Sequence, residues 1–215
     1  MISVNAGKVG LAQDDTGQAP GPPIMHALQI IEDEHRALAA VLHGMRYLVR
    51  ETLEHGTPPK FDVLGAMIYY IDAFPERVHH PRESDYLFRF LRARCPSAAS
   101  LIDQLEVEHR DGAQRIRSLE QALARYRHGG APEFPAFAAA VEAYVASQYD
   151  HMRREERELL PLARQHLEPS DWEVIDAAFT GGSVPSFGSD SAQDFQKLFG
   201  LIVRLAPPPI GVGPS

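Results

Sequence analysis

The sequence has little cysteine and no long apolar segment. Cys95 is the only cysteine among 215 residues, which excludes an internal disulfide and a metal site built from several thiolates. No apolar run reaches the roughly 20 residues that a membrane-spanning helix needs, and the first residues lack the basic and apolar pattern of a secretion signal. The sequence therefore predicts a cytoplasmic protein without a membrane partner.

Positive charge is also scarce. The chain has 21 lysines and arginines against 29 aspartates and glutamates, giving a net charge of −8 at pH 7, and no basic cluster offsets this. Because proteins bind nucleic acid through clustered positive charge, the composition argues against a nucleic-acid partner. The hydrophobic content of 44% and the length suit one folded domain with a sizeable core.

Strand patterns are weak, whereas helical periodicity is strong. Apolar residues recur at steps of three and four in four long segments, which predicts helices at about 24–54, 61–93, 97–128 and 132–165. Short breaks rich in Gly and Pro separate these segments. Short connections favour antiparallel neighbours, so the predicted fold class is all-α: an up-down-up-down four-helix bundle.

The rest of the chain is predicted to flank this bundle. Residues 1–23 are expected to form a flexible N-terminal leader, 24–166 the bundle, and 167–215 a C-terminal helical extension and tail. A capping-box pattern from Ser170 to Glu173 predicts a short helix, and an amphipathic helix is expected at 190–205 after a loop. The apolar faces of these helices are too small to form a core alone, so we expect them to pack on the bundle.

Each of the four long segments places one histidine on the stripe that should face inward. These residues are His35, His79, His109 and His151. Thr57, in the first break, lies 22 residues from both His35 and His79, and the third break is equally distant from the other two. The four imidazoles are therefore expected within about one helical turn of one another. Buried imidazoles need a partner, and a bound metal pair is the simplest one.

Two glutamates complete the predicted ligand set. Glu83 follows His79 by four residues, and Glu155 follows His151 by four, so each carboxylate shares a helix face with its histidine. A carboxylate so placed can bridge two metals while its histidine binds one of them. Imidazole and carboxylate donors suit iron, manganese or zinc.

The sequence leaves the roles of three neighbouring residues open, namely those of His80, Glu156 and Tyr144. His80 is read either as a further ligand or as a solvent-side neighbour, and Glu156 as a surface residue or a partner of a ligand. Pro75 and Pro81 lie inside the second helix and predict irregular backbone at the ligand segment. Tyr144 lies on the same stripe as His151 and is expected in the core, with a redox role or a contact to a metal ligand as the alternative.

The motifs resemble those of the hemerythrin-like HHE cation-binding family. The resemblance rests on Glu34-His35, on His79-His80-Pro81-Arg82-Glu83, on Glu108-His109, and on the run from His151 to Glu156, and it covers about residues 24–166. It implies a four-helix bundle with a non-heme di-iron centre, that is, two bound iron ions. It also implies that His35 and His79 serve one iron and His109 and His151 the other, with Glu83 and Glu155 as bridges.

The sequence departs from the oxygen carriers of that family. Those proteins have a second histidine one turn before the ligand of the third helix, where this chain has Leu105, and their last carboxylate is an aspartate five residues after its histidine. We therefore expect a centre that reacts with oxygen, nitric oxide or peroxide, or that senses or handles iron, more than one that transports oxygen. Whether the protein is an enzyme stays open, because the sequence shows no separate acid, base or substrate pocket.

Two alternatives remain at this stage. The first is a ferritin-like di-iron oxidase, for which Glu32-x-x-His35 and Glu106-x-x-His109 match the expected spacing. The second is a helical interaction protein without metal. The sequence indicates neither the oligomeric state nor a partner protein.

Overall fold

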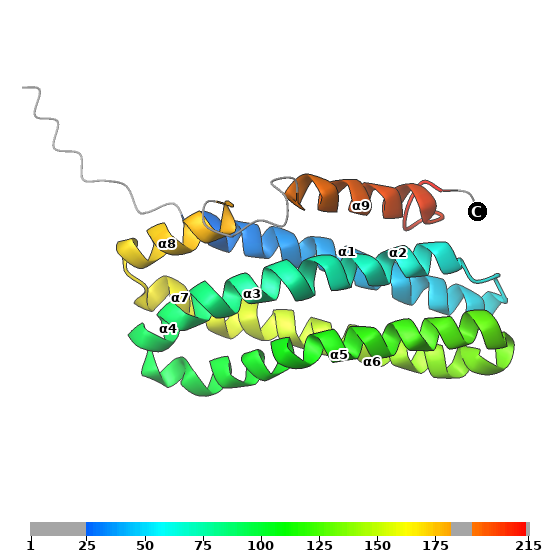
Figure 1. Cartoon of the computed structure of the whole chain (residues 1–215), viewed down its shortest axis with the longest axis horizontal. Helices are drawn as coiled ribbons and strands as arrows, with labels where there is room; N and C mark the ends of the chain where they lie inside the picture. The colour runs from blue at the N-terminus through cyan, green and yellow to red at the C-terminus, as the bar shows by residue number, and fades with distance from the viewer. Residues whose placement is uncertain (1–24, 182–190, 214–215) are drawn as a thin grey trace, which may run out of the picture.

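Four long antiparallel helical rods form the body of the molecule in the computed structural model, which describes residues 25–181 and 191–213 (Figure 1). The first rod is α1 (His26–His55), and the third is α5 (Ala99–Gly129). The second rod runs through α2 (Phe61–Ile71), η1 (Asp72–His79), α3 (His80–Arg82), η2 (Glu83–Phe88) and α4 (Arg89–Arg94). The fourth comprises α6 (Phe134–Arg154), η5 (Glu155–Leu159) and α7 (Leu160–His166).

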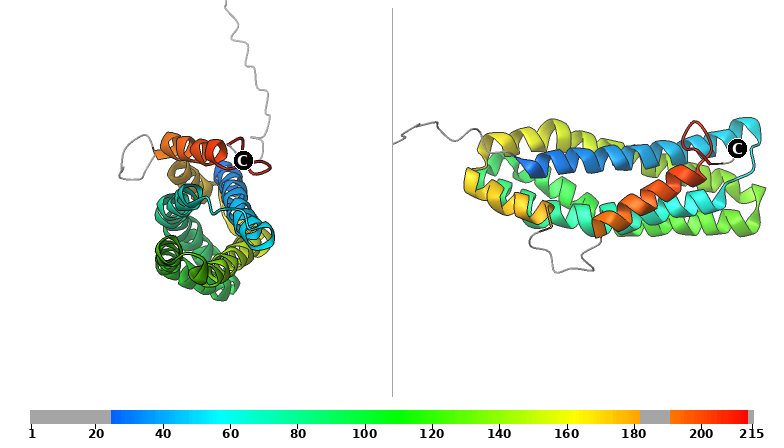
Figure 2. Two further views of the ribbon diagram at one scale, coloured as in Figure 1. Left: turned by 90° about the vertical axis from the view of Figure 1, so that its right-hand side faces the viewer. Right: turned by 90° about the horizontal axis from the view of Figure 1, so that it is seen from above.

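The connections are short, as the sequence predicts. Gly56 ends α1 in the left-handed region at φ 66°, which glycine adopts without a steric penalty. The 3-10 turns η3 (Pro96–Ala98) and η4 (Ala131–Glu133) lead into the third and fourth rods. The rods contact their neighbours in a closed ring, which the end-on view in Figure 2 shows, and the described residues contain no strand. The predicted all-α, up-down-up-down bundle is therefore confirmed.

The extension forms two further helices that pack on the bundle, also as predicted. Helix α8 (Pro169–Phe179) covers one end of α1, and α9 (Ser191–Leu205) lies across the outside of α2 (Figures 1 and 2). The prediction for the start of α8 was wrong in detail. Glu168 caps the helix and Asp171 completes the capping box, because Pro169 fits the first helical position. The leader 1–23 and most of the loop 181–189 lie outside the described residues.

A polar layer divides the hydrophobic core of the bundle into two parts. One cluster, which includes Met45, Met67 and Phe137, fills the half beside the first and third loops. The other, which includes Phe88, Ile102 and Trp172, fills the half beside α8. The predicted histidines and glutamates lie between them. Among the described residues, no helix is both long and apolar enough to cross a membrane.

Candidate metal centre

The polar layer contains a compact cluster of buried imidazoles and carboxylates. His35, His79, Glu83 and Glu155 form one group of potential ligand atoms, all within 4.8 Å of one another. A second group, at the same distance, consists of Glu83, His109, His151 and Glu155. Both glutamates belong to both groups, so the structure places them where each could bridge two ions. It thus brings together all six residues that the sequence singled out on the four inward stripes.

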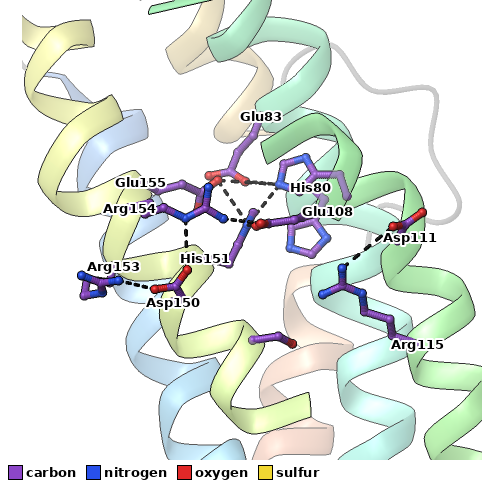
Figure 3. Close-up of polar contacts among 12 residues, drawn as sticks. His80, Glu83, Glu108, Asp111, Arg115, Asp150, His151, Arg153, Arg154 and Glu155 are labelled. Carbon is purple, nitrogen blue, oxygen red and sulfur yellow. Dashed lines mark hydrogen bonds and ion pairs between the residues drawn. The ribbon is translucent and has the colours of Figure 1, made fainter. Parts of the chain in front are cut away.

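The contact distances show how closely these side chains converge. The Nε2 atoms of His35 and His79 are 3.2 Å apart, and those of His109 and His151 are 3.1 Å apart. The carboxylate of Glu155 lies 3.2 Å from Nε2 of His35 and 3.3 Å from Nε2 of His151, and so touches both histidine pairs. Figure 3 shows Glu83, Glu155 and His151 turned toward one another.

Buried oxygen atoms without hydrogen bonds mark this layer as a cation site. Glu83 and Glu155 are fully buried, yet none of their four carboxylate oxygens has a hydrogen-bond partner in the described part of the chain. Burying a carboxylate is costly unless a counter-charge or a metal compensates for it. The donor set of neutral nitrogen and anionic oxygen fits iron, manganese or zinc.

The backbone at the ligands is π-helical. Segments η1, η2 and η5 contain or border His79, Glu83 and Glu155, and the amide of His80 donates to the carbonyl of Pro75, five residues back. The irregular backbone predicted in the second rod is therefore present. It takes the form of π-turns, which accommodate the missing amide of a proline and which recur at functional sites.

Polar residues around the cluster form hydrogen bonds with the outer nitrogen of each histidine. The Nδ1 atoms of His79 and His151 donate to Glu34 at 2.7 Å and to Glu108 at 2.8 Å. His35 uses Nδ1 to donate to Glu156 at 3.0 Å. In each case the hydrogen bond fixes the ring so that Nε2 faces the centre, as in other metal-binding histidines.

His109 is held in the same way by a neutral group. Its Nδ1 is hydrogen bonded to the hydroxyl of Ser84 at 2.9 Å. Two arginines back the outer carboxylates: Arg82 lies 3.7 Å from Glu34, and Arg154 pairs with Glu108 (Figure 3). The sequence interpretation assigned no role to Glu34, Ser84 or Glu108, although the repeated Glu-His dipeptide was a usable signal.

His80 is buried inside the cluster and not on the solvent side. Its ring stacks on that of His109, with centroids 4.2 Å apart and an angle of 13° between the planes. One nitrogen of His80 also groups with His109 and His151 within the same 4.8 Å limit. The structure thus places His80 with the second histidine pair. Glu156 is half-exposed and faces His35, not the centre.

The protonation of the two bridging candidates differs strongly. Burial and the adjacent Glu155 raise the pKa of Glu83 well above its usual range. Burial also acts to raise the pKa of Glu155, but the imidazoles of His151, His109 and His35 outweigh it and hold that pKa well below its usual range. Without a metal, the centre therefore pairs one neutral and one ionised carboxyl group.

The histidines divide in the same manner. Burial lowers the pKa of His79 strongly and that of His109 to about 3. For His35 and His151 burial is outweighed by the carboxylates of Glu155 and of Glu156 or Glu108, and each pKa rises to about 9. In the metal-free protein, protons on these two imidazoles supply the positive charge that the buried glutamate requires.

The family comparison agrees with this geometry. The family model of the hemerythrin HHE cation-binding domain matches residues 26–163, which is more than half of the chain.

The chain belongs to the hemerythrin HHE family.

No curated protein and no solved structure matches it significantly. Membership of the HHE family supports a cation-binding bundle, and the two His/Glu groups are the residues that could hold the cations.

Proposed function

We propose that this HHE protein holds two iron ions and reacts with a small ligand such as oxygen, nitric oxide or peroxide, for sensing or iron handling and not for oxygen transport. The observation that carries the proposal is the sharing of Glu83 and Glu155 between two pairs of buried imidazoles. Iron at such a site would supply redox chemistry toward these ligands. The protein groups would orient the donors and exclude bulk water.

The environment of the centre argues against oxygen transport. Leu105, where the family's oxygen carriers have an imidazole, is fully buried in the apolar cluster beside α8 and offers no donor. We expect small ligands to approach the centre from the side of His109 that Ser84 contacts. Ser84, which is hydrogen bonded to the imidazole of His109, also lines a surface cleft of about 510 Å³ together with Arg89 and Arg92.

The two alternatives find less support. A ferritin-like oxidase would use Glu32 and Glu106 as ligands, but these side chains pair with Arg164 at 2.8 Å and with Arg92 at 3.2 Å, away from the centre. A metal-free bundle would need Glu83 to stay neutral, buried and without a hydrogen bond, and would need protons on His35 and His151 to balance Glu155. A cytoplasmic location stays a prediction of the sequence.

Metal analysis of protein purified without oxygen tests the proposal. We expect two irons per chain, and near-ultraviolet absorption that develops in air without reversible oxygen uptake. Glu83→Gln and Glu155→Gln should each lose at least one iron, whereas Glu120→Gln, on the exposed face of α5, should keep both. The metal assignment is wrong if no transition metal is present and chelator leaves the melting temperature unchanged. Reversible oxygen uptake would restore the carrier interpretation.

A further inference from the structure

The centre has an internal two-fold pattern that pairs the first two rods with the last two. Each half repeats a Glu-His dipeptide and a His-x-x-Arg-Glu motif. The contacts repeat as well, because Glu34 holds His79 as Glu108 holds His151. Residues that follow the shared glutamates also correspond, since Ser84 contacts His109 and Glu156 contacts His35. Departures from this pattern indicate what distinguishes the two halves.

Three departures occur together at the contact between the second rod and α5. Where the second rod has Glu76 and His80, the fourth rod has Gln148 and Met152 at the equivalent positions, three residues before and one residue after the repeated histidine. Where α5 has Gly112, three residues after its histidine, α1 has the buried Leu38. An additional imidazole, an additional carboxylate and the absence of a side chain therefore coincide in one place.

The three residues fit one another sterically. A Cβ atom at position 112 would overlap the carboxylate of Glu76, so any other residue there would displace this carboxylate from its present position. Glu76 has a side-chain exposure of 2%, and its Oε2 lies 3.4 Å from Nδ1 of His80. Tyr144, on α6, donates its hydroxyl proton to Oε1 of Glu76 at 3.2 Å. The carboxylate of Glu76 thus accepts a hydrogen bond from Tyr144 and faces Nδ1 of His80, a buried nitrogen that has no hydrogen bond within the described residues.

We propose that Glu76 is a positioning residue that turns Nδ1 of His80 outward. Nε2 of His80 then remains as a third imidazole donor for the ion at His109 and His151. Tyr144 holds Glu76 by a hydrogen bond, and Gly112 leaves the space that the Glu76 side chain occupies. This inference rests on the proposed metal centre. It makes the two ion positions unequal, with three imidazoles at one and two at the other. Additional donors raise affinity, so the His80 position fills first.

Cobalt titration of the full-length metal-free protein tests the proposal. The wild type should bind two Co²⁺ ions in two resolved steps. Glu76→Gln and Gly112→Ala should weaken the first step at least about tenfold and shift its visible bands, with the second step unchanged. Tyr144→Phe, which removes one hydrogen bond to Glu76, should give a smaller loss in the same step. His80→Met, which copies the other half, should merge the two steps into one.

A matched control and a metal-free readout separate positioning from packing. Leu38→Ala, at the position equivalent to Gly112, should lower the melting temperature but leave the order of cobalt binding and the bands unchanged. In the metal-free wild type, nitrogen NMR of the imidazoles should show the proton of His80 on Nδ1. Glu76→Gln should shift this proton toward Nε2. If Glu76→Gln does not fold, Tyr144→Phe tests the same contact.

The outcomes distinguish this inference from the proposed function. Two cobalt ions bound by the wild type, with identical steps and spectra in Glu76→Gln and His80→Met, would overturn the positioning role and leave the metal centre intact. Failure of the wild type to bind any cobalt would overturn both.

Discussion

At the scale of single residues, the buried charges of the metal-free centre balance one another, and metal binding changes the protonation of the groups that carry them. Two imidazoles with raised pKa values face one ionised and one neutral carboxyl group. Metals bind neutral imidazole and ionised carboxylate, so binding must displace the protons on His35, His151 and Glu83. The same groups that stabilise the metal-free fold therefore oppose metal binding at low pH.

This balance predicts opposite pH dependences for metal affinity and metal-free stability. Below about pH 9, His35 and His151 are protonated in the metal-free centre, and Glu83 adds a third proton wherever it is neutral, so the overall affinity for the two ions should rise by roughly two to three decades per pH unit toward that value. Because both pKa values are raised on folding, the stability they contribute is full below pH 6.5 and is lost as the pH rises to about 9.

Two measurements check this prediction. Calorimetric titration in buffers of different ionisation enthalpy should show proton release on metal binding at pH 7.5. Urea denaturation of the chelated protein between pH 6.5 and 9 should show falling stability, while the metal-loaded protein, whose imidazoles no longer titrate, serves as the control. Metal binding without proton release would contradict the assigned charges.

Helical periodicity was sufficient to find the six residues of the inner layer, but it could not find their partners. His35 or Glu155 stands out because a polar residue interrupts an apolar stripe. Glu34 and Glu108 lie beside the stripe, where polar residues are ordinary, and their contacts reach across to the histidine of another rod. Such contacts depend on the rotation of each helix about its axis, which short-range sequence pattern does not specify.

At the scale of elements, the π-helical segments decide where the ligands point. A π-turn inserts one additional residue into the helix and so rotates the residues that follow. Pro75 lies inside η1, and Pro161 lies two residues after the end of η5, so an amide is missing where regular α-helical bonding would require one. The sequence predicted irregularity from these prolines, but the kind of irregularity depends on packing between the rods.

Replacing Pro81 should separate stability from metal binding. Pro81 lies between His79 and Glu83 in α3, which is flanked by η1 and η2. In Pro81→Ala a restored amide favours regular helix, so the free energy of unfolding of the metal-free protein should rise by about 1–3 kcal/mol. The changed register of the ligands should lower metal affinity about tenfold or more.

Urea denaturation of the chelated protein and cobalt titration measure the two effects. Pro135→Ala is the matched control, because Pro135 lies in the first turn of α6, far from a π-segment, and should change neither quantity much. An increase in both stability and affinity in Pro81→Ala would show that the π-turns do not position the ligands.

At the scale of the whole molecule, the bundle depends on the extension at both ends of the core. On α8, the buried residues Trp172, Ile175 and Phe179 belong to one apolar cluster, and Asp176 accepts hydrogen bonds from the first amides of α1. The first turn of α1 has no cap of its own, so α8 supplies one. On α9, Ile202 is buried in the other cluster, and Phe199 packs near Tyr70.

These contacts predict the behaviour of two shortened chains. A chain that ends at residue 190 lacks α9, and one that ends at residue 166 lacks both helices. Loss of each fully buried apolar side chain costs about 1.5–3 kcal/mol, so the free energy of unfolding should fall by several kcal/mol at the first truncation and further at the second. Both chains should expose apolar surface and bind more hydrophobic dye.

The centre lies between the two clusters and its ligands belong to residues 35–155, so a chain that still folds should retain its metals. Urea denaturation and metal analysis of the three chain lengths decide the matter. An unchanged denaturation midpoint in the chain that ends at residue 166 would show that the bundle is stable by itself, whereas loss of metal from a folded truncated chain would show that α8 or α9 supports the centre.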